Sequence, residues 1–151
     1  MSISSSIDVR LYSSKKSVYP YDIYISFLKN GWTDKINGMI NYLPFDDNGM
    51  FNWQSAELST QNIPLLINAK VKANETLGFM FIKQTDLPPG KQIGVTLLYH
   101  VDTEVYSIIL SINRKKVSEE ITDVNWYLSE IYKIIHHAGY EIESIKFEEH
   151  V

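Results

Sequence analysis

Two pairs of residues that contain histidine are the first candidates for chemistry. His100 and Asp102 are two positions apart in a strand-like stretch, so their side chains lie on one face of it. A histidine that is oriented by a carboxylate can act as a general base. A nucleophile would also be needed, and Ser107 or Ser111 on the following strand meets that need only in a suitable register. We therefore expect a surface hydrogen bond here and not a catalytic site.

The second pair, His136 and His137, lies near the end of the stretch "NWYLSEIYKIIHHAG", residues 125–139. Adjacent residues on a helix point about 100 degrees apart, so the two imidazoles cannot bind one metal ion as an i, i+4 pair does. The last turn of a helix favours cations and offers uncapped carbonyl groups. We interpret the pair as the polar end of a core helix, and we expect neither a metal site nor a cofactor.

Acidic residues at predicted turns and element ends suggest a surface for a basic protein. The chain has 18 acidic against 14 basic residues and a net charge of -4, which argues against nucleic acid as the partner. Charge would steer the encounter, and exposed aromatic side chains would supply the anchors. The candidate partner-binding residues are Asp46, Asp47, Trp53, Tyr99, Asp102, Glu104, Glu119 and Glu120.

Composition narrows the class of protein further. The 151 residues contain no cysteine, which excludes disulfides, thiolate metal sites and a cysteine nucleophile. No apolar run approaches the roughly 20 residues that span a bilayer, and the first residues do not resemble a secretory signal. We expect a cytoplasmic protein with no membrane partner. The aromatic content of 13% indicates a folded chain with one core.

The hydrophobic periodicity predicts alternating strands and helices. Alternation predicts strands, and the apolar stripe of Tyr127, Ile131 and Ile134 predicts a helix. The stretch 20–29 fits both patterns, and we favour a helix because Pro20 suits a first turn. Asn62 and Thr122 are the expected caps of the later helices. The predicted strands are 7–13, 39–43, 77–83, 93–101, 105–112 and 140–150, and the predicted helices are 20–29, 62–72 and 123–138.

This order of elements predicts a single α+β domain over residues 1–151. Strands that follow one another as hairpins, with helices between others, favour a mainly antiparallel sheet with about three helices packed against it. We expect the 93–112 hairpin near the centre of the sheet and the 123–138 helix packed on it. Residues 1–6 are expected to be flexible.

Two stretches resemble a known class of proteins. "GW" followed by "INYLPFDDNGMFNW", and later "TDVNWYLSEIYKII", are similar to immunity proteins of bacterial polymorphic-toxin systems, particularly those of contact-dependent growth inhibition. The resemblance covers about the middle and C-terminal two-thirds of the chain. It implies a cytosolic protein that binds the toxic C-terminal domain of a cognate effector and blocks it. Such proteins use different surfaces for different toxins, so the resemblance assigns no binding residue.

Two other classes remain open from the sequence. One is a small enzyme that uses the His100 and Asp102 pair, which would require a cleft and a third polar partner. The other is a structural or adaptor subunit, for example of a phage or a secretion apparatus. A large apolar surface patch or a stable homo-oligomer would favour that class.

Overall fold

The computed structural model describes residues 3–88 and 90–150, and this part of the chain forms an α+β fold. No helix in those ranges is long and apolar enough to cross a membrane. The helices are α1 (Pro20–Lys29), α2 (Asn62–Lys72) and α3 (Val124–His137). The strands are β1 (Ser4–Tyr12), β2 (Trp32–Thr33), β3 (Lys35–Ile36), β4 (Met39–Tyr42), β5 (Gln54–Ala56), β6 (Leu77–Lys83), β7 (Gly94–His100), β8 (Val105–Ile112), β9 (Lys116–Ser118), β10 (Ile121–Thr122) and β11 (Glu141–His150).

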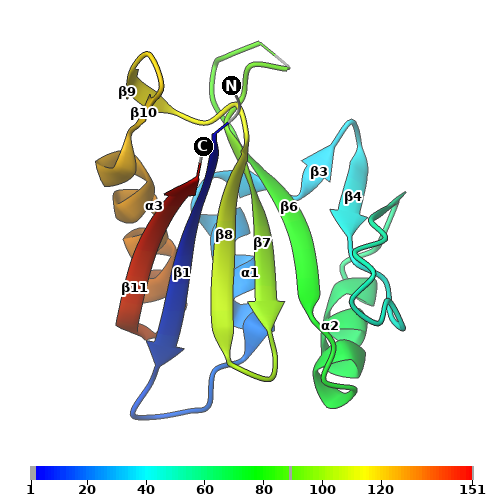
Figure 1. Cartoon of the computed structure of the whole chain (residues 1–151). Helices are drawn as coiled ribbons and strands as arrows, with labels where there is room; N and C mark the ends of the chain where they lie inside the picture. The colour runs from blue at the N-terminus through cyan, green and yellow to red at the C-terminus, as the bar shows by residue number, and fades with distance from the viewer. Residues whose placement is uncertain (1–2, 89, 151) are drawn as a thin grey trace.

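The large sheet is antiparallel and has the order β11-β1-β8-β7-β6-β4-β3. The β7–β8 hairpin lies in the middle, as the sequence predicted, because its apolar residues need neighbours on both sides. Figure 1 shows β11 and β4 toward opposite sides of the sheet, with α1 and α3 behind it. The short β9–β10 hairpin lies outside this sheet, beyond the end of β8.

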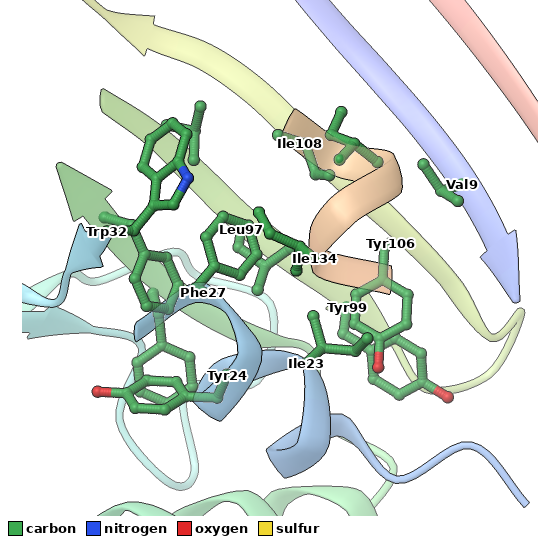
Figure 2. Close-up of a cluster of buried hydrophobic side chains, with 14 of the residues drawn as sticks. Val9, Ile23, Tyr24, Phe27, Trp32, Leu97, Tyr99, Tyr106, Ile108 and Ile134 are labelled. Atoms are coloured by element: carbon green, nitrogen blue, oxygen red, sulfur yellow. The ribbon is translucent and has the colours of Figure 1, made fainter. Parts of the chain in front are cut away.

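The core lies between the sheet and the three helices. Alternation along β1 sends Ile7 and Val9 into this core and leaves Asp8 and Arg10 on the opposite side, which we call the outer face. Aromatic rings fill the centre of the core (Figure 2), where Phe27 of α1 stacks on Phe81 of β6 with ring centroids 4.4 Å apart. Burial of such rings supplies most of the energy that holds the layers together.

Local signals explain where two of the helices begin and end. Pro20 occupies the first turn of α1, and Gly31, with φ of +84°, follows the residue that ends it. Asp123 caps α3, because its side chain accepts a hydrogen bond from the Trp126 N–H. Because residues 20–29 form α1, the prediction of a helix for this stretch is confirmed.

Three local predictions were wrong. β1 begins at Ser4, so the expected flexibility of residues 1–6 does not hold for Ser4–Ser6, and residues 1–2 lie outside the described ranges. Asn62 is the first residue of α2 and not its cap, since its side chain accepts hydrogen bonds from Ser59. Thr122 belongs to β10, and Asp123 takes the capping role. In each case a tertiary or neighbouring contact replaced the local preference.

The packing of α3 predicts unequal effects of truncating two of its apolar residues. Ile131 is buried in the core, whereas Leu128 is only partly buried. Ile131→Ala should lower the free energy of unfolding by about 2 to 5 kcal/mol, through lost transfer energy and a new cavity, and Leu128→Ala by less than half of that. Urea unfolding of the two variants measures the difference. Equal midpoints would show that the packing of α3 differs from this structure.

Candidate partner-binding surface

A buried lysine organises one end of the molecule. Lys70 of α2 has a side chain that is only 1% exposed, and its Nζ donates to the backbone carbonyl oxygens of Leu43, at 3.1 Å, and Pro44, at 2.7 Å. The carboxylate of Glu75 lies 3.6 Å from the same nitrogen. Burial lowers the pKa of Lys70, while the charges of Glu75 and Asp47 oppose that shift. The lysine thereby fixes the chain directly after β4.

Two carboxylates continue this network into the segment of residues 43–53, which we call the anchor loop. Glu75 accepts hydrogen bonds from the backbone N–H groups of Asp46 and Asp47. Asp47 in turn accepts from the N–H groups of Phe51 and Asn52, each at 2.9 Å. Carboxylates that accept backbone N–H bonds are among the stronger hydrogen-bond acceptors in proteins. The anchor loop is therefore held by its backbone and needs no contact from its outward side chains.

The backbone of the anchor loop has an unusual conformation. Asp46, Asn48 and Phe51 all have positive φ values, between 53° and 65°, and Gly49 has φ of +73°. Asparagine and aspartate tolerate this region, but a bulky residue such as phenylalanine rarely adopts it. Such strain persists where surrounding contacts over-determine the conformation, and it gathers at functional sites. Here the contacts to Asp47 on both sides of the turn supply that constraint.

The anchor loop exposes three large apolar side chains. Phe45 is 54% exposed, Met50 78% and Phe51 46%. Trp53 is half-buried and packs on the outer face of the sheet over Gly78, where a Cβ atom would lie 2.9 Å from its ring. Large apolar side chains presented by an ordered backbone are typical anchors of a protein–protein interface, because the backbone loses little conformational entropy when they bind.

Acidic side chains flank the same end of the sheet. Leu77 pairs with Tyr99, so the start of β6, which follows Glu75, lies beside the end of β7. The β7–β8 turn carries Asp102 and Glu104, and both are exposed, as is Asp46 in the anchor loop. The lower part of Figure 1 shows this turn near the junction of α2 and β6. The exposed apolar side chains of the anchor loop and these three carboxylates therefore lie toward one end of the molecule.

Six of the eight predicted partner-binding residues are exposed or half-buried, and they lie at two ends of the sheet. Asp46, Asp102 and Glu104 are exposed at this end, and Trp53 is half-buried beside it. Glu119 and Glu120 are exposed on the β9–β10 turn at the opposite end of the sheet, where Glu120 pairs with Arg114 and Lys116. Glu119 and Glu120 therefore do not share a surface with Asp46, Asp102 and Glu104.

The exposure expected of two of these residues was wrong. Asp47 is buried because it accepts the hydrogen bonds of the anchor loop. Tyr99 is buried in the core, where its ring lies 4.5 Å from that of Tyr106. Both side chains are buried within the fold, so neither is available to contact a partner.

The His100 pair has a different arrangement from the one expected. His100 Nε2 lies 3.3 Å from Ser107 Oγ, across the β7–β8 hairpin. Asp102 instead accepts a hydrogen bond from the N–H of Thr103, and no hydrogen bond joins Asp102 to His100 in the described residues. The structure thus assembles a serine–histidine contact on the outer face without the predicted carboxylate.

The second histidine pair lies in the last turn of α3, as expected, and both residues are exposed. His137 Nδ1 lies 2.8 Å from Asn30 Oδ1, and the ring of His136 stacks on that of Tyr132. Across residues 3–88 and 90–150, no cluster of three or more His, Cys, Asp or Glu could hold a metal ion. The contact of His137 with Asn30 joins the ends of α1 and α3.

Sequence reasoning missed the residues that build the anchor loop. Lys70 continues the apolar stripe of Ile63 and Ile67 at positions i, i+4 and i+7, and this placement was the available signal for its burial. Comparison with known proteins adds no assignment, since no family model, curated protein or solved structure matches this chain. The site is therefore argued from its geometry alone.

Removing the buried ammonium should loosen the anchor loop. Lys70→Met leaves two carbonyl groups and Glu75 without their partner, and we expect a loss of about 3 kcal/mol in the free energy of unfolding. Hydrogen exchange at the amides of Phe51 and Asn52 should also become faster. The matched control is Lys72→Met, an exposed lysine of the same helix, which should change stability by about 0.5 kcal/mol or less. Equal stability of the two variants would contradict the role of Lys70.

Proposed function

We propose that this chain is an immunity protein that binds the toxic C-terminal domain of a cognate bacterial effector and neutralises it without catalysing a reaction. The anchor loop carries this proposal. It exposes three apolar side chains, and the Lys70, Glu75 and Asp47 network holds its backbone without using those side chains. A chain that must bind quickly and tightly benefits from anchors that are ordered before the encounter.

The exposed carboxylates at this end of the molecule indicate what kind of partner surface would be bound. Asp102, Glu104 and Asp46 are exposed toward the same end of the molecule as the anchor loop, and the whole chain carries a net charge of -4. A nuclease toxin has a basic substrate channel, because it must bind phosphates. Acidic side chains at the rim would occupy the positions of phosphate groups while the apolar side chains fill the neighbouring surface. The protein would then act by steric and electrostatic occlusion.

Truncation of the anchors should abolish protection without unfolding the protein. Phe45→Ser and Met50→Ser each remove an exposed side chain, so the free energy of unfolding should hardly change. Each should weaken binding to the toxin domain by about 2 kcal/mol, which is about a thirtyfold rise in Kd. The measurements are calorimetric binding and survival of sensitive cells that co-express the toxin domain encoded directly upstream.

Val117→Ser is the matched control, because Val117 is an exposed apolar residue of the β9–β10 hairpin at the far end of the molecule. It should retain full protection. A wild-type chain that fails to protect and forms no complex at micromolar protein would overturn the proposed function. If both anchor variants still protect the cells, the toxin binds a surface other than the anchor loop.

The acidic rim should control the rate of association. Asp102→Asn combined with Glu104→Gln should slow association with the toxin domain by about threefold to tenfold at low salt, with a much smaller change in the dissociation rate. The difference from wild type should shrink as salt rises. Glu119→Gln, at the other end of the sheet, provides the control and should leave the rate unchanged. A salt-independent association rate would exclude steering by these carboxylates.

One observation favours a hydrolase as the second candidate. Ser107 Oγ and His100 Nε2 are 3.3 Å apart, the arrangement of a nucleophile and a general base. An inhibitor would not need this contact, whereas a hydrolase would depend on it. Ser107→Ala therefore separates the two candidates in the survival assay, since full protection by this variant supports inhibition and loss of protection with intact binding supports catalysis.

A further inference from the structure

The strand β11 forms one edge of the large sheet. It is ten residues long, and in the described part of the chain it pairs with β1 alone. Figure 1 shows it as the outermost strand, on the side of the sheet away from β4. A long edge strand presents unpaired N–H and C=O groups that can accept another strand.

A break in the pairing limits the regular part of this edge. Ser4 to Arg10 pair without interruption with His150 to Ser144, and then the register shifts between Arg10 and Leu11. A bulge of this kind bends the strand and increases its twist. The regular edge is therefore the segment Ser144–His150, and the residue at its midpoint is Phe147.

We propose that two copies of this chain form a dimer by antiparallel pairing of their β11 strands, with the two-fold axis at Phe147. A two-fold contact is self-complementary, so each pair of opposed residues occurs twice. Lys146 of one copy then lies opposite Glu148 of the second copy, and Ser144 lies opposite His150. All helices remain on one side of the joined sheet, because this axis is perpendicular to it.

Charge favours this register over its neighbours. An axis at Lys146 would place that lysine opposite its own copy and Glu143 opposite Glu149. An axis at Ile145 would oppose Glu141 and Glu149. Like charges directly opposite one another destabilise a strand pair, whereas opposite charges stabilise it. The axis at Phe147 creates two Lys–Glu contacts and opposes no carboxylate to another.

Apolar side chains at this edge are incompletely covered. Ile145 and Phe147 project toward the helix side of the sheet, yet Ile145 is 41% exposed and Phe147 is half-buried. A second β11 would bring two copies of Phe147 together at the axis, with Ile145 of each copy opposite Glu149 of the other. The anchor loop follows β4, at the other side of the sheet, so the dimer leaves both copies of the loop accessible.

Charge reversal tests the proposed register. In each folded chain Lys146 already contacts Glu148 at 2.7 Å, so both side chains are solvent-accessible partners that tolerate exchange. Wild-type protein should sediment as a dimer at micromolar concentration. Lys146→Glu and Glu148→Lys should each weaken self-association about tenfold or more, because each creates two like-charge contacts. The variant that carries both substitutions should dimerise again.

Mixing the two single variants gives the sharpest outcome. An equimolar mixture of Lys146→Glu and Glu148→Lys should form a heterodimer, since both cross-axis contacts then join opposite charges. Lys72→Glu changes the net charge equally at an exposed site of α2, on the side of the sheet away from β11, and it should leave the dimer intact. A monomeric wild type would overturn the proposal and indicate that the charges of β11 guard the edge against pairing. If none of these charge reversals changes the strength of self-association, the dimer does not form through β11.

The absence of native cysteine permits an independent check of the register. Phe147→Cys places two thiols directly opposite each other, with Cβ atoms about 4.5 to 5.5 Å apart, and mild oxidation should link the chains. Ser144→Cys is the control, because its two copies lie six residues apart along the paired strands, about 20 Å. Linking of the control as readily as of Phe147→Cys would overturn the register.

Discussion

The ammonium group of Lys70 is the constraint on which the anchor-loop end of the molecule depends. A charge that is removed from water must find polar partners, and the partners here are two backbone carbonyls of the anchor loop and the carboxylate of Glu75. Because Glu75 also accepts from the backbone of Asp46, one buried cation fixes both a helix and a loop. The apolar side chains of that loop are then free to face solvent.

The two edges of the sheet differ in strand length and regularity. At the β4 side, short strands and the strained anchor loop prevent a simple continuation of the ladder. At the β11 side, a regular seven-residue edge carries one lysine, two glutamates and incompletely covered apolar side chains. The β7–β8 hairpin lies between them, where burial on both sides makes the register strongly specified. The central hairpin thus separates the anchor loop from the β11 edge.

The sequence predicted the α+β class, the three helices, the main strands and the central hairpin, because burial follows periodicity. It failed where a polar residue is buried. Asp47 resembled a surface residue by type, but it is satisfied by backbone N–H groups. Tyr99 shares a strand face with the buried Val95 and Leu97, so periodicity did indicate its burial against Tyr106. Which polar groups find partners depends on contacts between distant segments, such as Lys70 with Leu43, and periodicity carries no information about those.

The network also explains how such a surface could change without loss of the fold. The apolar side chains of Phe45 and Met50 form no hydrogen bonds, whereas the side chains of Lys70, Glu75 and Asp47 hold the loop through its backbone atoms. Substitution of the exposed side chains therefore leaves the constraint intact, while substitution of the buried charges removes it. A scaffold with this division can present different apolar and acidic side chains to different partners, so that architecture can be shared between proteins whose binding residues are not.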